Sequence, residues 1–404
     1  MEERQRDVGP TGEGPPVDAR RLTGVDAARG LALIGMVAVH TLSLWNDETG
    51  RATLAGLLFS GKASALFVTL AGVGLALGSG RRTPRRGREL AAARASLAAR
   101  AAVLALVGLL TGYPEPPANN ILVYYAAYFL LALPLLGLRA RALLPLCVLL
   151  LVAGPLLRWW LMSSWSLAED STDPHLLLLL TDPGTVLLQV LLTGVYPALP
   201  WLAYLCAGLA LGRTDLSQQR VQIRLVAGGA VLALGSWGAS MLGLHVLGGE
   251  QAVLRAAPWL TAEELDAVVA VGRGTAVPDD PWWLVVPGPH TTTPFALALC
   301  LGTALCALGL VLLLARVAAR ALAPLAALGS MTLTLYACHL TVLGLGAHEA
   351  APAGWFWAQV AAALLLAVAW RRHVGPGPLE HLAALAARAA GRRVLARSAP
   401  ADRS

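Results

Sequence analysis

Charge is scarce in this chain of 404 residues. Asp, Glu, Lys and Arg make up 14% of it, whereas 56% is hydrophobic, and the mean hydropathy is +0.63. About a quarter of a soluble domain is charged, because its surface must be wetted. The deficit argues against a soluble globule, a disordered chain and a disulfide scaffold. An integral membrane protein with several spans is the class that remains.

Lysine and cysteine are also rare. Lys62 is the one lysine among 31 basic residues. The basic residues, with a net charge of +7, lie in short gaps between apolar runs, a pattern typical of membrane orientation and not of nucleic-acid binding. The cysteines lie inside apolar runs without a CxxC pair, which indicates buried packing thiols rather than metal ligands or disulfides: Cys147, Cys206, Cys300, Cys306 and Cys338.

Ten apolar stretches are long enough to cross a bilayer as helices. The predicted fold class is therefore all-α, a polytopic helical membrane bundle of about ten transmembrane helices. Tyr196, Pro197 and Pro200 predict a kink in the sixth. The predicted spans are residues 25–45, 55–79, 96–113, 119–137, 141–161, 185–211, 223–247, 294–315, 324–346 and 353–370.

The gaps between these stretches alternate between arginine-rich and acidic, which predicts cytoplasmic positions for both termini. We expect a disordered N-terminal tail over 1–24, a membrane domain over 25–372 and a basic cytoplasmic tail over 373–404 that contains an amphipathic helix, Leu379–Ala390. The longest outer gap, about 248–293, is expected to be an irregular loop, in which Trp282 and Trp283 are either binding residues or interface anchors. The expected location is the plasma membrane; a homo-oligomer is left open.

Ionisable side chains at membrane depth are costly and therefore informative. Asp26 and Arg29 share one face of the first span, where they form either an orienting ion pair or a donor approach. His40 lies eleven residues beyond Arg29, which is about three helical turns further along nearly the same face. A polar stripe thus follows one side of the first span.

The topology places further polar side chains in the outer half of the membrane. They are Lys62 in the second span, Asn120 with the following Tyr124 and Tyr125, His290 and His339. Together with His40 these residues are predicted to line one outward-facing cavity, although each histidine taken alone favours a satisfied packing role over a catalytic one. The three histidines come from distant segments without a zinc spacing signature, so no metal is expected.

Such a cavity suits acyl transfer. A neutral histidine can take a proton from a hydroxyl or an amine, and Asn or Thr donors can stabilise an oxyanion. A cytoplasmic arginine cluster can bind a polyphosphate such as that of coenzyme A, or it is simply the orientation signal. This candidate donor site comprises Arg81, Arg82, Arg85 and Arg86.

Five segments resemble a known membrane family in the same order. They are residues 21–40, 61–74, 120–126, 289–295 and 324–340, and they are similar to motifs of the bacterial DUF418 and YeiB-like proteins, which are related to the catalytic domain of heparan-alpha-glucosaminide N-acetyltransferase. Asn120 and Lys62 stand where many relatives have Asp and Arg. The resemblance covers roughly residues 20–372.

The resemblance implies a transmembrane acyltransferase. Acetyl-CoA or another acyl-CoA would be the cytoplasmic donor, and the acceptor would be an envelope glycan, a lipid or a small amine. His40 matches the catalytic histidine of the sugar acetyltransferases, and Asn120, His290 and His339 would orient the acceptor or stabilise the oxyanion. Two other interpretations stay open: a transporter of a small envelope precursor that uses the same cavity without chemistry, and a scaffold.

Overall fold

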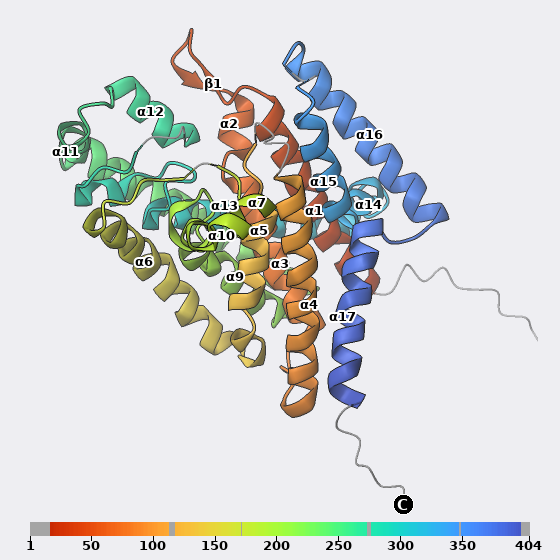
Figure 1. The fold of residues 1–404 in the computed structure, drawn as a ribbon. Coiled ribbons are helices and arrows are strands. Elements are labelled where there is room, and N and C mark those ends of the chain that lie inside the picture. Colours follow the sequence, from red (N-terminus) through yellow and green to blue (C-terminus); the bar gives the residue numbers. More distant parts are fainter. Residues whose placement is uncertain (1–16, 113–117, 171, 273–275, 347–348, 397–404) are drawn as a thin grey trace, which may run out of the picture.

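The computed structural model describes residues 17–112, 118–170, 172–272, 276–346 and 349–396. Within them the helices are joined by loops, and the one two-stranded sheet is a short hairpin, β1 (Trp45–Asn46) and β2 (Arg51–Ala52) (Figure 1). The first half contains α1 (Val17–Thr41), α2 (Leu54–Phe59), α3 (Lys62–Gly78), α4 (Gly87–Thr111), α5 (Leu122–Leu131), η1 (Pro134–Gly137), α6 (Ala140–Ser164), α7 (Leu176–Thr181), α8 (Pro183–Leu188), η2 (Gln189–Thr193) and α9 (Ala198–Gly212).

The second half begins with a long helix that ends in a π-helical turn. Its elements are α10 (Gln219–Met241), η3 (Leu242–Val246), α11 (Gly249–Ala256), α12 (Ala262–Val271), η4 (Pro281–Val285), α13 (Pro294–Val317), α14 (Ala323–Gly329), α15 (Thr332–Leu343), α16 (Pro352–His373) and α17 (Pro378–Ala396). The expected all-helical fold is thus found. The tail prediction for 1–24 is only partly open to inspection, since α1 begins at Val17 and residues 1–16 lie outside the described part.

Six helical segments of the described chain are long and apolar enough to cross a membrane, or seven if one bent pair counts as a span. The six are Leu54–Gly78, Gly87–Thr111, Ala140–Ser164, Gln219–Val246, Pro294–Val317 and Pro352–His373. The predicted count of ten uninterrupted spans is not confirmed. α5 has only ten residues, and α14 and α15 are bent by 75° at their junction.

The kink expected in the sixth stretch is present. The helix over Pro183–Thr193 stops, and α9 starts again at Ala198, directly after Pro197. Proline lacks the N–H group that would continue the helical ladder, so the break falls where the sequence predicts it. Each half is shorter than a bilayer core requires, which explains why neither counts as a span.

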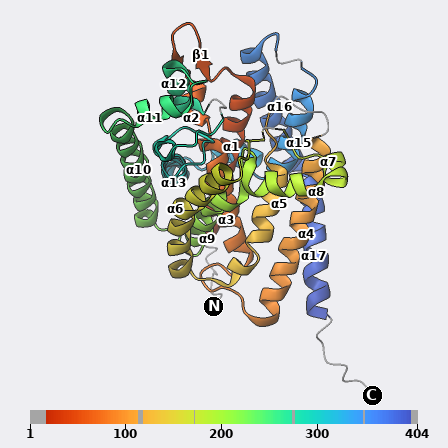
Figure 2. The ribbon, with the colours of Figure 1, turned by 60° about the vertical axis from the view of Figure 1, so that its left-hand side comes forward.

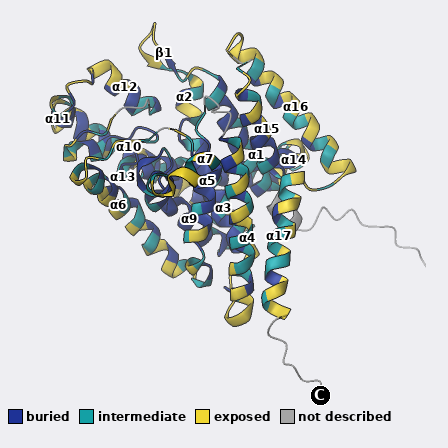
Figure 3. Cartoon of the chain, in the orientation of Figure 1, coloured by how far each residue is buried: buried dark blue, intermediate teal, exposed yellow. Residues whose placement is uncertain are grey.

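Small residues let α3 and α9 approach closely. A Cβ on Gly208 would lie 1.8 Å from the carbonyl oxygen of Thr69, and one on Gly72 would lie 2.2 Å from that of Leu205. Close backbone contact of this kind is how helices associate in lipid, where apolar burial gives little driving force. In contrast, α6 and α16 show broad exposed apolar faces that suit a lipid environment (Figure 3).

α11, α12 and the β1–β2 hairpin gather at one end of the bundle, which we call the hairpin end (Figures 1 and 2). The prediction of an irregular loop over 248–293 is wrong, because α11, α12 and η4 in this segment are helical. Trp283 is 2% exposed in a cluster with Val253 and Leu265. Since that cluster buries the apolar faces of α11 and α12, Trp283 serves the packing of this cap rather than anchoring at an interface.

The C-terminal helix is longer than the predicted 379–390 and packs beside α4 (Figures 1 and 2). The Glu380 carboxylate at its start accepts hydrogen bonds from the backbone N–H groups of Leu333 and Thr334, at 2.6 and 3.2 Å. It therefore caps the free N-terminus of α15 that the bend creates. The predicted buried state of the cysteines holds for Cys147, Cys206 and Cys300 but is wrong for Cys338, which is exposed.

Candidate functional site

His40 and His339 meet across the bundle. His40 is in the last turn of α1 and His339 is in α15, and their rings stack with centroids 5.3 Å apart and planes 6° apart. Nδ1 of His40 lies 3.0 Å from Nε2 of His339. Nδ1 of His339 in turn lies 2.7 Å from Oε1 of Gln359 in α16. Three helices thus contribute one hydrogen-bonded row of side chains.

Tyr336 and Tyr196 connect this row to the turn before α5. The Tyr336 ring lies 6.3 Å from His40, and its hydroxyl donates to the carbonyl oxygen of Asn119 at 3.3 Å. The Tyr196 hydroxyl donates to the same carbonyl oxygen at 3.4 Å. The ring of His290 then contacts Tyr196 edge-on at 5.3 Å. The histidines predicted to share a depth are therefore connected through Tyr336, the Asn119 carbonyl group and Tyr196.

His290 itself has a packed environment. Its ring stacks on Trp201 at 5.8 Å, and no water-sized space remains beside it. Its Nδ1 is buried without a hydrogen-bond partner, and its backbone has a φ of 65°. Burial lowers the pKa of His290 to about 4, so the ring is neutral. In the described chain no ring contact or hydrogen bond joins it directly to His40.

Asn120 is fully buried and uses its side chain to hold the backbone. Its amide nitrogen donates to the carbonyl oxygen of Gly108 and to Thr111 Oγ1, each at 2.9 Å. Its amide oxygen accepts from the N–H of Leu122 at 3.0 Å, at the start of α5. Its own N–H donates to the Asp173 carboxylate at 2.8 Å. Since burial is the larger effect, the pKa of Asp173 is raised to about 7.

Tyr336 also lines a cavity of about 350 Å³. α1, α3, α4, α5, α15 and α17 all contribute to its wall. Its polar lining combines two guanidinium groups with one carboxylate and two phenols, namely Arg29, Arg100, Glu380, Tyr125 and Tyr336. Arg29 also pairs with Asp26 at 3.1 Å, which is one of the two roles that the sequence left open for these residues.

Tyr124 and Tyr125 face different surroundings although they are neighbours. Tyr125 lines the cavity, and its hydroxyl has no partner. Tyr124 is 1% exposed and packs edge-on against Tyr196. Lys62 lies apart from both, because its Nζ donates to the carbonyl oxygen of Leu57 and its side chain lines a separate apolar groove between α1, α2, α3 and α13.

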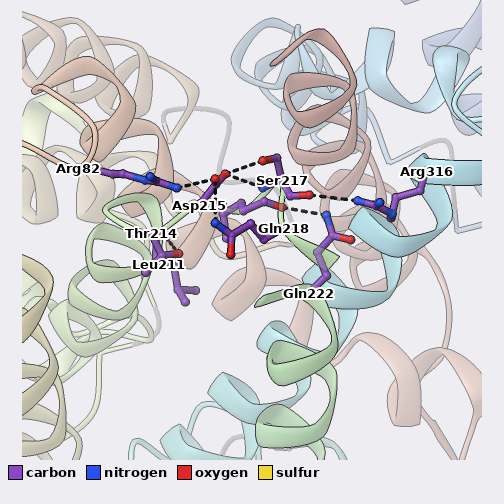
Figure 4. Close-up of polar contacts among 9 residues, drawn as sticks. Arg82, Leu211, Thr214, Asp215, Ser217, Gln218, Gln222 and Arg316 are labelled. Carbon is purple, nitrogen blue, oxygen red and sulfur yellow. Dashed lines mark hydrogen bonds and ion pairs between the residues drawn. The ribbon is translucent and has the colours of Figure 1, made fainter. Parts of the chain in front are cut away.

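The arginine cluster lies in the α3–α4 connection and does not line the cavity. Arg82 pairs with Asp215 at 2.5 Å, which ties this connection to the one between α9 and α10 (Figure 4). Hydrogen bonding from Ser217 lowers the pKa of Asp215 to about 2, so the carboxylate stays charged. Buried Arg213 donates to the carbonyl oxygens of Arg81 and Leu136, both at 2.7 Å.

Three residues that the sequence reasoning missed belong to this site. Gln359 is an amide inside an apolar span, and Arg100 is a charge inside another; both are signals of the kind already used for His40. Glu380 lay in a segment taken for a tail. In the described chain no three His, Cys, Asp or Glu side chains are grouped as a metal site.

The fold and these polar groups define a polytopic helical membrane protein with a buried histidine pair near a cavity lined by two arginines and a glutamate. The family model of the heparan-alpha-glucosaminide N-acetyltransferase catalytic domain matches residues 21–246, more than half of the chain. The protein belongs to this family of membrane acetyltransferases. No curated protein and no solved structure matches the chain. The matched residues include His40, Arg29, Arg100 and Asn120 and end before His290 and His339.

Proposed function

We propose that this protein transfers an acyl group from a cytoplasmic acyl-CoA to a hydroxyl or amine acceptor, with His40 as the general base. The acceptor class is an envelope glycan, a lipid or a small amine. The observation that carries the proposal is the position of Tyr336, which contacts both His40 and His339 and also lines the cavity that contains Arg29 and Arg100. Tyr336 thus stands between the histidine that would accept the proton and a cavity that contains two arginines.

The reaction balances with the side chains present. The acceptor oxygen or nitrogen attacks the thioester carbonyl carbon while a His40 ring nitrogen takes its proton. The C–S bond of the thioester breaks, and the proton returns to the departing coenzyme A sulfur. Arg29 and Arg100 suit the anionic donor, since a guanidinium stays charged when it is partly buried. The buried Asn120 acts as a positioning residue that fixes the start of α5.

The test uses the purified full chain in nanodiscs. Acetyl-CoA is titrated by calorimetry, and transfer to glucosamine is followed as release of the coenzyme A thiol. We expect saturable binding that weakens in Arg29→Ala/Arg100→Ala, and transfer that is lost in His40→Ala while acetyl-CoA binding is retained. A folded wild type that binds neither acetyl-CoA nor longer acyl-CoAs would remove the donor, and a precursor transporter without chemistry would then be the better model.

A further inference from the structure

We infer that Gln359 is a positioning residue that decides which nitrogen of His40 carries the lone pair. The inference rests on the proposed function in one respect only, namely that His40 acts as a base. Its structural basis is the row Gln359–His339–His40, in which each neighbour is joined to the next by one hydrogen bond. Neither Gln359 nor His339 lies in the region that matches the family model.

The direction of the protons follows from the first bond. The amide oxygen of Gln359 can only accept, so Nδ1 of His339 must carry a proton and donate it. A neutral imidazole has one N–H, which leaves Nε2 of His339 as an acceptor. The 3.0 Å contact then requires that Nδ1 of His40 donates.

The remaining nitrogen of His40 is therefore a free base. Nε2 has its lone pair available, and in the described residues it makes no hydrogen bond that would occupy it. The tautomer of a histidine is set by what its other nitrogen bonds, as in catalytic triads where a carboxylate orients the base. Here an amide acts through a second histidine to achieve the same result over a longer row.

The orientation of the Gln359 amide sets the direction of both hydrogen bonds in the row. Its Nε2 is buried without a partner, so the side chain has no second bond that competes with the one to His339. If the amide were turned over, its N–H would donate to His339 and every proton in the row would reverse. His40 would then present an N–H at Nε2 and could not accept a proton from the acceptor while neutral.

The first test reads the tautomer directly and needs no acceptor. The full chain is labelled with [15N]histidine in nanodiscs, and the His40 signals are assigned by their loss in His40→Ala. Spectra are recorded near pH 8.5, about two units above an ordinary histidine pKa. We expect a protonated Nδ1 and an unprotonated Nε2 for His40 in the wild type and in Gln359→Glu, whose carboxylate can only accept.

Removal of the acceptor should release the tautomer. In Gln359→Leu we expect His40 to move toward the Nε2–H form. The matched control is Gln222→Leu, because Gln222 is likewise a glutamine with one bonded and one unbonded amide atom, but it lies in α10 beside Leu216. A proton on Nε2 of His40 in the wild type, or a Gln359→Leu spectrum identical to the wild-type one, would overturn the inference.

The kinetic test separates this inference from the proposed function. With acetyl-CoA and glucosamine, kcat should fall about 10- to 100-fold in Gln359→Leu, as for lost orienting partners of other histidines, with a KM for acetyl-CoA within about two-fold. Gln359→Glu should retain kcat. Full activity in His40→Ala would refute the proposed function, whereas inactive His40→Ala together with fully active Gln359→Leu would refute the relay alone. Thermal melting shows whether Gln359→Leu is folded. Gln359→Glu keeps the size of the side chain, so it tests the relay without a change in packing.

Discussion

Two sides of the bundle differ in how much space they leave near their buried polar residues. On one side, α3, α9 and the segment before α13 pack with glycine at the contacts, and His290 lies among Trp201 and Tyr196 without adjacent space. On the other side, α1, α4, α5, α15 and α17, together with part of α3, surround a cavity of about 350 Å³, and Tyr336 in its wall contacts the His40 pair. Two histidines of equal predicted depth thus differ in whether a substrate could come near them: the space lies near His40 and not beside His290.

The difference follows from which elements are continuous. α3 and α9 approach each other through small residues, which leaves no space between these two helices. α14 and α15 break at a 75° bend, and this break exposes backbone N–H groups that Glu380 of α17 satisfies. A broken helix beside a cavity is typical of binding sites in membrane proteins, because irregular backbone is tolerated there only where protein or water satisfies it.

The largest contrast should appear when each histidine is replaced by phenylalanine, which keeps a ring but removes both nitrogens. His40→Phe should lower kcat for acetyl transfer about 100- to 10,000-fold, the range for a lost general base. His290→Phe should leave kcat within about three-fold, because its ring packs against Trp201 without space for a substrate. Equal losses of kcat in the two variants, both shown to be folded, would contradict the assignment of different roles to His40 and His290.

The close contact between α3 and α9 predicts a stability effect. Gly208→Ala would place a methyl group 1.8 Å from the Thr69 carbonyl oxygen, and we expect a loss of about 1–3 kcal/mol from overpacking. Thermal unfolding in detergent measures it. Gly235→Ala on α10 is the control, since nothing lies within 4 Å of its added Cβ. Equal melting temperatures for the two variants would show that α3 and α9 are not held in close contact.

Two sets of arginines sharpen the comparison further. Arg29→Ala/Arg100→Ala should raise the KM or Kd for acetyl-CoA about ten-fold, because both side chains line the cavity. Replacement of Arg81, Arg82, Arg85 and Arg86 should change it less than three-fold, since Arg82 is paired with Asp215 outside the cavity. Calorimetry distinguishes the two sets. A larger effect from the second set would move the donor site to the α3–α4 connection.

The smallest effect concerns pH and Asp173. Burial raises the pKa of this carboxyl to about 7, above the ~3.9 of an unfolded aspartate. The folded state therefore favours the protonated form, and the stabilisation that this group contributes is complete below about pH 4 and lost as the pH rises to about 7. The melting temperature of the wild type should fall over this range by a few degrees more than that of Asp173→Asn. Parallel curves would contradict the raised pKa.

The sequence alone indicated that the chain lies in a membrane and which polar residues are candidates for the site. Scarce charge and long apolar runs allow only a helical membrane protein, because a backbone in lipid must satisfy its own hydrogen bonds. The cost of polar groups at that depth singled out His40, Arg29 and His339 before their neighbours were known. Pro197 and Pro200 marked the break in the sixth stretch, since proline ends a helical ladder wherever it stands.

Only the tertiary structure decided what these residues face. Depth along a helix axis says nothing about rotation or about partners on other helices, so the sequence placed Asn120 and His290 beside His40 as equals. The fold commits Asn120 to the start of α5 and His290 to an aromatic stack, and it brings Gln359 to His339. It also packs the helix expected in the C-terminal tail against α4 as α17, whose Glu380 caps α15. Such contacts join residues tens to hundreds of positions apart, and packing sets them where no local pattern can.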